Sequence, residues 1–563
     1  NCIPSDMTHN DRNTSDSGDI VDSFAEHFAQ SFIKHNSSSH LGCSSLNKNV
    51  LSIKCVSQEC VYNAIKKLKP KMTNGPDRIP AFIIRDCANV FVEPLTTLFN
   101  LILKTFTFPQ KWKVSRICPV YKKGDRSNVV NYRPIAIICN FAKVFELVLH
   151  TYISNHISQM ISPNQHGFIS GRSTETNLIT FTQFLHDSLD DQRQVDVIYT
   201  DYSKAFDTID HSLLIQKLEC FGFADPLIKL FTSYLDSRYL FVGLNGYRSK
   251  LLKQETGVPQ GSVLGPLLFI VFINDIVDVI NKHSLLFADD LKIYSLINSY
   301  DDAAQLQKCL DRVYQWSENN NLKLNKSICY VMTFTKRTES LMFNYNIDGT
   351  TLNRPEVICD LGVIFDSKLS FSHHIQFISE AAYKSLGFVI RNGREFGDVE
   401  TLKTLYLSYC RSRMEYASII WSPIYNIHIA FLERIQRRFL KTMVYILDGT
   451  YPPRGFSQQS LLARFQMSSL LTRRIEHSLI LLFKILQGVH ECPAILFNLN
   501  FKINRANARN KNTFYLPAVR TLSAVASPLM QMLSNCTSLE KNDIDIFNCT
   551  INDIRRYLNN SQF

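Results

Sequence analysis

Acidic residues at the ends of two apolar segments are the side chains in this sequence best suited to chemistry. Asp201 follows a β-branched run, and Asp289 and Asp290 interrupt the apolar stretch between Ser284 and Tyr294. Carboxylates held close together repel one another, which raises their pKa values. A divalent cation removes this repulsion because it is hard and prefers oxygen ligands. The three aspartates are therefore candidate metal ligands, provided that the two segments are neighbouring strands.

Other residues could serve the same chemistry. Phe206 lies five residues beyond the first carboxylate, and a glycine-rich turn over residues 257–266 leads into a strongly apolar run. Upstream, Lys122, Lys123 and Arg133 could hold phosphates, because arginine binds phosphate oxygens bidentately and lysine acts as a point charge. Each feature alone is ordinary, since aspartates at strand ends and hairpin tips usually cap or solvate a turn. Their combination indicates a catalytic site.

The elements that must position these residues follow from hydrophobic periodicity. We expect a buried strand over residues 195–201, a β-hairpin over 284–294 with the paired aspartates at its tip, and a buried helix over 264–280. Residues 403–443 are expected to be helical apart from a break at Trp421–Pro423.

The N-terminal part has a different character. Residues 1–20 are rich in Asn, Asp, Ser and Thr and are expected to form a flexible lead. Residues 21–33 are expected to form a helix that packs on the body, because Phe24, Phe28 and Phe32 recur at helical spacing.

Length and composition exclude several classes of protein. The 563 residues are 45% hydrophobic and 20% charged, which rules out a mainly disordered chain. At about 100–200 residues per domain, three to five structural units are expected. The longest apolar run, residues 263–273, is too short for a membrane span of about 20 residues.

The fifteen cysteines are scattered and form no Cys-x-x-Cys pair or zinc-finger spacing. Cys118, Cys139, Cys329 and Cys359 lie in apolar stretches and are expected to be buried free thiols. This pattern favours a reducing compartment.

The net charge of +11 is unevenly distributed. Residues 101–150 carry a net +7, residues 401–450 a net +4, and residues 502–520 five basic side chains and no acid, whereas residues 1–60 carry a net −3. One such block could be a solvated face. Three separated basic blocks fit a long polyanion better.

At these residues the chain resembles the reverse transcriptases of non-LTR retrotransposons, most closely the Jockey-like branch. The resemblance rests on segments in the expected order: Trp112-Lys113, Lys122-Lys-Gly-Asp125, Asn131-Tyr-Arg-Pro-Ile135, Gln165-His-Gly-Phe-Ile-Ser-Gly-Arg-Ser-Thr174, Asp201-Tyr-Ser-Lys-Ala-Phe-Asp207, Gly257-Val-Pro-Gln-Gly261, Phe287-Ala-Asp-Asp290, Leu322-Lys-Leu-Asn325 and Leu361-Gly-Val-Ile-Phe-Asp366. Two later segments, Arg411–Ser418 and Ile435–Leu440, resemble the thumb region of this branch. The similarity therefore covers about residues 75–445.

This resemblance implies an α+β fold shaped as a right-hand polymerase, with fingers, an antiparallel-sheet palm and a helical thumb. It places the reverse transcriptase domain at about residues 103–366. The expected organisation is an N-terminal extension over residues 1–75, fingers over 76–185, a palm with primer grip over 186–372, a thumb over 373–445, and a C-terminal region of unknown role over 446–563.

The resemblance also implies how catalysis would occur. Asp201 and Asp289 would hold two Mg²⁺ ions, with Mn²⁺ as an alternative, the Tyr202 carbonyl as a backbone ligand and Asp290 in support. Two ions about 3.5–4 Å apart can activate the primer 3′-hydroxyl and stabilise the leaving pyrophosphate.

Further roles are implied for residues around the metals. Phe206 would exclude a 2′-hydroxyl and so select dNTPs, Gln260 and Gly261 would border the nucleotide, and Arg133 would clamp the triphosphate with Lys122 or Lys123. Residues implied to contact template or primer are Gln165, Gly167, Arg172, Leu361, Gly362, Arg437 and Arg438.

One position departs from the family. A lysine three residues after the Asn of Leu-x-Leu-Asn is often assigned as proton donor to pyrophosphate, and Ile328 stands there. Lys326 could substitute after a shift in register. A lost general acid costs about 10²–10⁴ in rate.

Two functions are therefore carried forward. The first is an RNA-directed DNA polymerase that acts in the nucleus on an RNA template, a DNA primer and dNTPs. The second is a catalytically silent, polymerase-like nucleic-acid-binding remnant, which Ile328 favours. A group II intron or telomerase enzyme fits the thumb segment less well, and a metal-dependent hydrolase would need more histidines or acids. Because the chain begins Asn-Cys-Ile-Pro, we expect a fragment that lacks upstream domains.

Overall fold

The computed structural model describes residues 3–9, 12–32, 49–393, 395, 398–502 and 512–560. The chain divides into two compact units. Unit 1 comprises Asn1–Phe168, Thr200–Leu291 and Cys309–Cys329, and unit 2 comprises Ile169–Tyr199, Lys292–Lys308 and Tyr330–Phe563.

Unit 1 combines helices with short and long strands. Its helices are α1 (Ser17–Ala29), α2 (Gln58–Lys67), α3 (Ala81–Asp86), α4 (Ala88–Thr105), α5 (Asn140–Ile157), α7 (His211–Cys220), α8 (Asp225–Leu235), α9 (Leu264–Ile273) and α10 (Ile276–Val279), with 3-10 turns η1 (Gln110–Lys113), η2 (Val129–Asn131) and η3 (Lys326–Ile328). Its strands are β1 (Met7–His9), β2 (Arg12–Thr14), β3 (Val114–Tyr121), β4 (Tyr132–Ile137), β6 (Arg238–Leu244), β7 (Tyr247–Arg248), β8 (Leu252–Gln254) and β9 (His283–Phe287).

Unit 2 is mainly helical. Its helices are α6 (Thr174–Asp190), α12 (Ser372–Gly393), α13 (Val399–Tyr406), the π-turn η5 (Leu407–Arg411), α14 (Ser412–Glu415), α15 (Ser418–Trp421), α16 (Asn426–Asp448), α17 (Gln458–Arg464), α18 (Leu470–Leu486), α19 (Pro493–Leu496), α20 (Leu522–Val525), α21 (Pro528–Glu540) and α22 (Ile551–Asn560). Its strands are β11 (Tyr330–Phe334), β12 (Asn346–Ile347), β13 (Thr350–Thr351), β14 (Val357–Asp360) and β15 (Val363–Asp366). Three elements, β5 (Gln194–Thr200), β10 (Asp290–Ile297) and α11 (Tyr300–Asn319), continue from one unit into the other.

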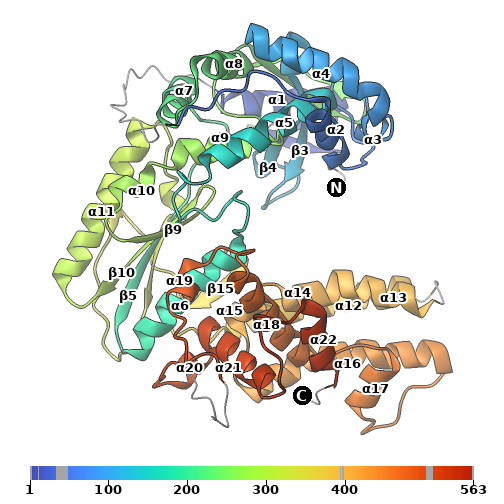
Figure 1. The fold of residues 1–563 in the computed structure, drawn as a ribbon, viewed down its shortest axis with the longest axis vertical. Helices are drawn as coiled ribbons and strands as arrows, with labels where there is room; N and C mark the ends of the chain where they lie inside the picture. The colour runs from blue at the N-terminus through green and yellow to red at the C-terminus, as the bar shows by residue number, and fades with distance from the viewer. Residues whose placement is uncertain are drawn as a thin grey trace. The chain divides into compact units, whose positions relative to one another are not determined.

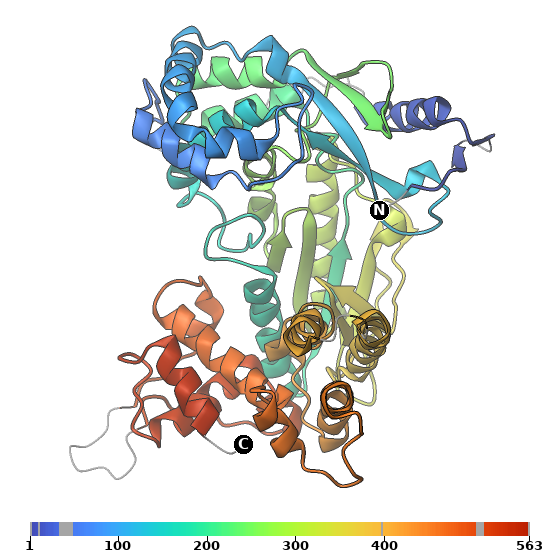
Figure 2. The ribbon, with the colours of Figure 1, turned by 90° about the vertical axis from the view of Figure 1, so that its right-hand side faces the viewer.

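A sheet in unit 1 has the order β4-β3-β6-β7, with β8 also paired to β6. Strand β3 runs antiparallel to β4, with Val120 opposite Arg133, and parallel to β6. Helix α1 lies beside β6 and β7 (Figure 2) and packs Phe24 and Phe28 into a core with residues of β3, β4 and β6. The N-terminal helix therefore shares its hydrophobic core with the sheet that carries Arg133.

A second sheet has the strand order β11-β5-β10-β9. Strand β5 lies between β10 and β11, and β11 pairs with it in antiparallel register. Strand β5 is buried along almost its whole length, including its polar residues Gln194, Asp196 and Thr200. The expected strand and hairpin are thus confirmed, and β5, which ends before Asp201, is the neighbour of β10, which begins just after Asp289.

In unit 2, α18 packs against α16, α21 and α22 (Figure 1). A separate core surrounds Phe181 of α6, whose ring contacts four other aromatic rings at centroid distances between 5.3 and 6.3 Å: Tyr199, Tyr294, Phe334 and Phe365. Helix α6 is therefore anchored by apolar packing on one side.

Two expected segments are wrong in detail. Within the N-terminal lead, Met7–His9 and Arg12–Thr14 form the antiparallel strands β1 and β2, with Met7 and His9 buried, and residues 17–20 already belong to α1. The single helix expected over 264–280 divides between α9 and α10. Lys217 Nζ donates to the Phe272 carbonyl (2.6 Å) and to Asp275 (2.8 Å), so side chains replace the helical hydrogen bonds at this point.

The helical region after residue 403 has an additional interruption. A π-turn precedes α14, and Ala417 adopts a left-handed conformation (φ +50°) before α15. Cys139 and Cys329 are buried free thiols as expected, whereas Cys118 is half-buried and Cys359 is exposed on the short β14–β15 hairpin. Ile33 and residues 503–511 of the third basic block lie outside the described residues.

Among the residues that the structure describes, no helix is long and apolar enough to cross a membrane.

The C-terminal region runs along α6 and bonds to it at several points. Near the start of α6, the Glu491 amide donates to the Gly171 carbonyl (2.8 Å). In the middle, Gln183 accepts from the Leu529 amide (3.0 Å). At the end, Asp190 accepts from the Arg520 and Thr521 amides at 2.9 and 2.8 Å and from the Thr521 hydroxyl at 2.8 Å. Backbone and side-chain groups of Glu491, Arg520, Thr521 and Leu529 therefore brace this helix near its start, middle and end.

The Asp190 contact gives a first prediction. Asp190→Ala should lower the free energy of unfolding by about 2 kcal/mol, because it removes a charged acceptor that satisfies two backbone amides. Thermal unfolding should show a drop in Tm of a few degrees. Burial raises the pKa of Asp190, but the hydrogen bonds from Arg520 and Thr521 outweigh it and lower that pKa. The stabilisation should therefore be present near neutral pH and be lost as the pH falls below about 4.

Asp191→Ala is the matched control, because Asp191 makes only longer ion pairs with the exposed Arg193 and Arg520 (3.4 and 3.5 Å). Equal losses for the two variants would show that Asp190 does not anchor the C-terminal region.

Candidate active site

Asp201 and Asp289 lie at the ends of neighbouring strands. Asp201 follows the last residue of β5, and Asp289 occupies the turn between β9 and β10. The Thr200 hydroxyl donates to the Leu291 carbonyl (3.2 Å), which ties the end of β5 to the start of β10. Strand pairing thus brings together two carboxylates that lie 88 positions apart in the sequence.

The two carboxyl groups share an unfavourable electrostatic environment. Burial raises the pKa of Asp201, against the attraction of Lys122, Lys123 and Arg133. The pKa of Asp289 is also raised, by burial and by the charge of Asp201, although its own backbone amide and the nearby cations oppose the shift.

Within the described residues, neither carboxylate forms a salt bridge, so their charges are only partly compensated. A divalent cation is the natural complement to such a pair.

Asp290 differs from its two companions because it is exposed at the first position of β10. Across the described part of the chain, no group of three or more His, Cys, Asp or Glu side chains is arranged to hold a metal. A metal here would therefore need backbone or water oxygens beside the carboxylates of Asp201 and Asp289.

The Tyr202 carbonyl, expected from the sequence to be a backbone ligand, takes no part in the pairing with the neighbouring segment. Tyr202 pairs with Leu324 in an isolated antiparallel bridge, flanked by bonds from the Asn325 amide to the Asp201 carbonyl and from the Ser203 amide to the Lys323 carbonyl. In such a pair the two central residues exchange no hydrogen bonds, so the Tyr202 carbonyl points away from Leu324.

The same pairing locates the position that departs from the family. Asn325 donates to the Asp201 carbonyl (2.8 Å), and Ile328 follows in the partly exposed turn η3. Lys326 Nζ lies 5.4 Å from the centroid of the Tyr314 ring, so this lysine already has a partner. Position 328 therefore lies in a turn that begins at Asn325, the residue whose amide is hydrogen-bonded to the Asp201 carbonyl.

Phe206 is held by aromatic packing. Its ring stacks on Phe269 (4.5 Å, 19°) and meets the edge of Phe168 (6.2 Å, 86°). The Phe206 carbonyl accepts from the Val258 amide (2.9 Å), which fixes the backbone against the glycine-rich turn. The ring remains partly exposed, as a residue that contacts a nucleotide must be.

The glycine-rich turn packs closely on β4. The Gln260 carbonyl accepts from the Ala136 amide (2.8 Å), and a β-carbon at Gly261 would lie 2.3 Å from the Ala136 carbonyl oxygen. Because Arg133 is exposed on the same strand, the turn and the predicted triphosphate clamp share one support. Lys122 and Lys123 are exposed just after β3.

Gln165 and Gly167, expected along the template path, are buried against the turn that carries Asp289. The Gln165 amide bonds to the backbone of Ala288, and Gly167 packs on the same residue. The structure therefore places both residues with the carboxylates.

Unit 2 holds the remaining predicted residues. Leu361 and Gly362 form the β14–β15 turn with positive φ, and the Tyr416 hydroxyl donates to the Leu361 carbonyl (2.8 Å). The Arg172 side chain, 10% exposed, pairs with Glu491 (2.7 Å). In α16, Arg437 donates to the Phe456 carbonyl (2.7 Å), whereas Arg438 is exposed. Arg438 is thus the freer of this pair to meet a polyanion.

Sequence reasoning missed several supporting residues. Lys204 Nζ donates to the Ser31 hydroxyl (2.7 Å), and its charge opposes a burial effect that raises the pKa of Asp207 to about 7. Glu146 is fully buried and accepts from the Val263 amide (2.6 Å) at the start of α9. Lys204 and Ser31 lie 173 positions apart in the chain, and Glu146 and Val263 lie 117 apart, so no local motif could have revealed these two hydrogen bonds.

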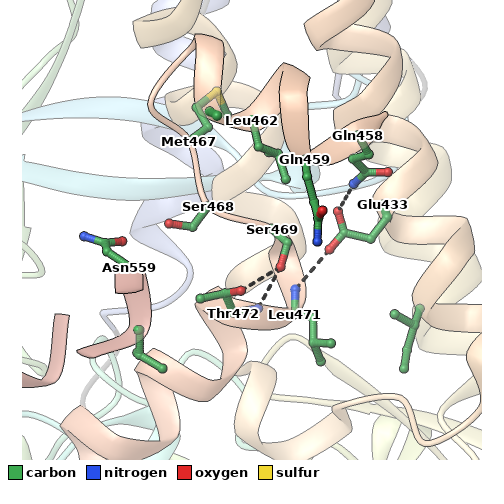
Figure 3. A pocket seen from close by; sticks show the side chains of 13 residues that line it. Glu433, Gln458, Gln459, Leu462, Met467, Ser468, Ser469, Leu471, Thr472 and Asn559 are labelled. Atoms are coloured by element: carbon green, nitrogen blue, oxygen red, sulfur yellow. Dashed lines mark hydrogen bonds between the residues drawn. The ribbon is translucent and has the colours of Figure 1, made fainter. Parts of the chain in front are cut away.

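A pocket of about 510 Å³ lies in unit 2 among α16, α17, α18 and α22 (Figure 3). Glu433 accepts from Gln458 (2.8 Å) and from the Leu471 amide (3.0 Å), and burial raises its pKa. None of the residues predicted to bind nucleotide, template or primer lines this pocket.

Comparison with known proteins shows what this part of the chain is similar to. Residues 120–389 match the family described as reverse transcriptase (RNA-dependent DNA polymerase). The chain is 29% identical over 377 residues to the RNA-directed DNA polymerase from mobile element jockey of Drosophila melanogaster, covering 64% of this chain and 41% of that protein. It is 26% identical over 420 residues to the probable RNA-directed DNA polymerase from transposon BS of the same organism, covering 72% and 46%.

A further relative is the probable RNA-directed DNA polymerase from transposon X-element of Drosophila melanogaster, 28% identical over 359 residues, with 61% of this chain and 39% of that protein covered. The chain therefore spans less than half the length of these curated relatives. The resemblance to non-LTR retrotransposon enzymes is confirmed.

Reverse transcriptase domains generally use divalent metal ions. The two partly buried carboxylates without salt-bridge partners among the described residues fit such an ion, because burial raises the pKa of both and a bound cation would stabilise their charged forms.

This repulsion leads to a second prediction. In metal-free buffer near pH 7, Asp289→Asn should raise Tm by a few degrees, because it removes a charge that burial and Asp201 make unfavourable. The sign follows from the raised pKa of Asp289: the folded state binds a proton more readily than the unfolded state, so the penalty is present above the folded-state pKa. The difference from wild type should therefore shrink as the pH falls to about 4.

Asp290→Asn, at the exposed neighbour, is the control and should change Tm little. Addition of Mg²⁺ should stabilise the wild type more than Asp289→Asn. A lower Tm for Asp289→Asn in metal-free buffer would show that the two carboxylates do not repel each other.

Proposed function

We propose that this chain, whose residues 120–389 form a reverse transcriptase domain, is an RNA-directed DNA polymerase of a non-LTR retrotransposon. It would extend the 3′-hydroxyl of a DNA primer on an RNA template, using dNTPs and two Mg²⁺ ions. The observation that carries this proposal is the pairing of β5 with β10, which sets Asp201 beside Asp289 with three cations within electrostatic range.

The residues present would divide the chemistry as follows. Asp201, Asp289 and the Tyr202 carbonyl would hold the metal ions, with Asp290 in support, and the metals would activate the primer hydroxyl and neutralise charge on the pyrophosphate. Lys122, Lys123 and Arg133 would bind the triphosphate. Phosphoryl transfer depends mainly on positioning and charge neutralisation, which explains why acids and cations dominate the site.

Nucleotide selection would fall to Phe206, Gln260 and Gly261. The stack of Phe206 on Phe269 supports this role, because a ring fixed from one side can exclude a 2′-hydroxyl on the other. In this proposal the fingers comprise residues 76–185, the palm 186–372 and the thumb 373–445. Template and primer would contact the thumb through Arg438, and the primer end would meet the Leu361–Gly362 turn.

The central test is primer extension on an RNA template with Mg²⁺ and dNTPs. Asp289→Ala should reduce the rate by at least about 10³-fold, equivalent to about 4 kcal/mol of lost transition-state stabilisation. Asp301→Ala, which removes an exposed aspartate from α11, is the control and should retain the wild-type rate. Extension that persists in Asp289→Ala would disprove the assigned site.

A specific observation also favours the silent remnant. Ile328 occupies the position of the family's lysine, and Lys326 lies over Tyr314. In that case the protein would bind RNA–DNA duplex without extending it.

The substitution Ile328→Lys separates the two functions. If the polymerase is active but lacks its general acid, we expect the extension rate to rise by about 10–100-fold, since general acid catalysis contributes about 10²–10⁴. Tyr330→Lys, which adds the same charge at the start of β11, is the control. Duplex binding with no extension by either the wild type or Ile328→Lys would favour the remnant.

A further inference from the structure

The turn that carries Asp289 is tied to a distant segment by one buried side chain. Gln165 is 3% exposed, and its Oε1 accepts hydrogen bonds from the amides of Ala288 (2.9 Å) and Gly167 (2.8 Å). Its Nε2 donates to the Ala288 carbonyl (3.3 Å). Both ends of the amide therefore bond to the residue immediately before Asp289.

The backbone around Gln165 reinforces this contact. The Leu286 amide donates to the Asn164 carbonyl, and the His166 amide donates to the Leu286 carbonyl, both at 2.9 Å. Gln165 thereby forms a parallel bridge with Leu286 of β9. The segment 164–166 thus acts as a short additional strand beside the hairpin.

The approach is so close that only glycine fits at position 167. A β-carbon on Gly167 would lie 2.3 Å from the Ala288 amide nitrogen. Ala288 itself has φ +57°, a left-handed conformation that residues other than glycine rarely adopt without support. The Gln165 amide supplies that support because it satisfies both the amide and the carbonyl of Ala288.

We propose that Gln165 is a positioning residue that holds the Ala288–Asp289 turn in the conformation in which the Asp289 carboxylate meets Asp201 and binds the metal. The inference rests on the proposed function, because it assumes that Asp289 is a metal ligand. A glutamine suits this place because it can donate and accept without adding a charge beside two carboxylates. A glutamate would keep the acceptors, lose the donor and add a third negative charge.

The test compares Gln165→Met, which keeps the side-chain length but cannot make the amide hydrogen bonds, with a matched control. Gln194→Met is that control, because Gln194 is 1% exposed and its amide bonds to both the amide and the carbonyl of Leu341 (2.8 Å each). Each variant loses a two-ended amide tie, but only Gln165 holds the Asp289 turn.

Two measurements decide the proposal. In the absence of nucleic acid, Tm is followed as MgCl₂ is added. In primer extension, the half-saturating Mg²⁺ concentration is determined together with the KM for dNTP.

Supports of metal ligands typically change metal affinity by about 10–100-fold when they are lost. Gln165→Met should therefore need about 10-fold more Mg²⁺ in both assays, with a change of less than about threefold in KM for dNTP. Gln194→Met should lose stability and keep the wild-type Mg²⁺ midpoint.

The outcomes separate this inference from the proposed function. If the wild type extends primers and Gln165→Met has an unchanged Mg²⁺ midpoint, the inference is overturned and the polymerase stands. If the wild type does not extend primers, the proposed function fails, and the Mg²⁺ titration of Tm still decides the role of Gln165. A wild type whose Tm does not respond to Mg²⁺ would also overturn the inference.

Discussion

The repulsion between the carboxylates of Asp201 and Asp289 is the constraint on which the rest of the candidate site depends. Burial makes the charged form of both groups unfavourable, and the charge of Asp201 adds to this effect at Asp289, so a rigid support is needed to keep them side by side. That support is the pairing of β5 with β10, completed by the bond from Thr200 to the Leu291 carbonyl. The cations of the β3–β4 hairpin then offset part of the charge. The strand pairing thus offsets the unfavourable burial of two carboxylates, and a bound cation would stabilise their charges directly.

Close backbone packing carries this rigidity outward from the carboxylates. Gly167 lies against Ala288, and Gly261 lies against Ala136, at distances that exclude any side chain. In each contact the second residue also donates its backbone amide: Ala288 donates to Gln165 Oε1, and Ala136 donates to the Gln260 carbonyl. The turn that carries Asp289 and the turn that borders the predicted nucleotide site are thus fixed in the same manner.

Segments outside the matched reverse transcriptase region also contribute to the two units. In unit 1, α1 completes the core beneath the sheet that carries Arg133, and Ser31 accepts from Lys204 in the segment between Asp201 and Phe206. In unit 2, Glu491, Thr521 and Leu529 brace α6 between Gly171 and Asp190. The sequence indicated no role for residues 446–563, and these contacts of their described part with α6 provide a structural one.

The sequence by itself determined the similarity to reverse transcriptases and the strands around the carboxylates, because these depend on local periodicity and on motifs in a fixed order. It did not determine which residues support them. The contacts of Gln165 with Ala288 and of Arg172 with Glu491 had no signal in the sequence, and neither did the Lys217 contact at the point where the helix expected over residues 264–280 divides. Each of these partners lies more than 50 positions away in the chain. Only the tertiary structure could decide them, because a hydrogen bond or an ion pair depends on distance in space and leaves no periodic signal in the sequence.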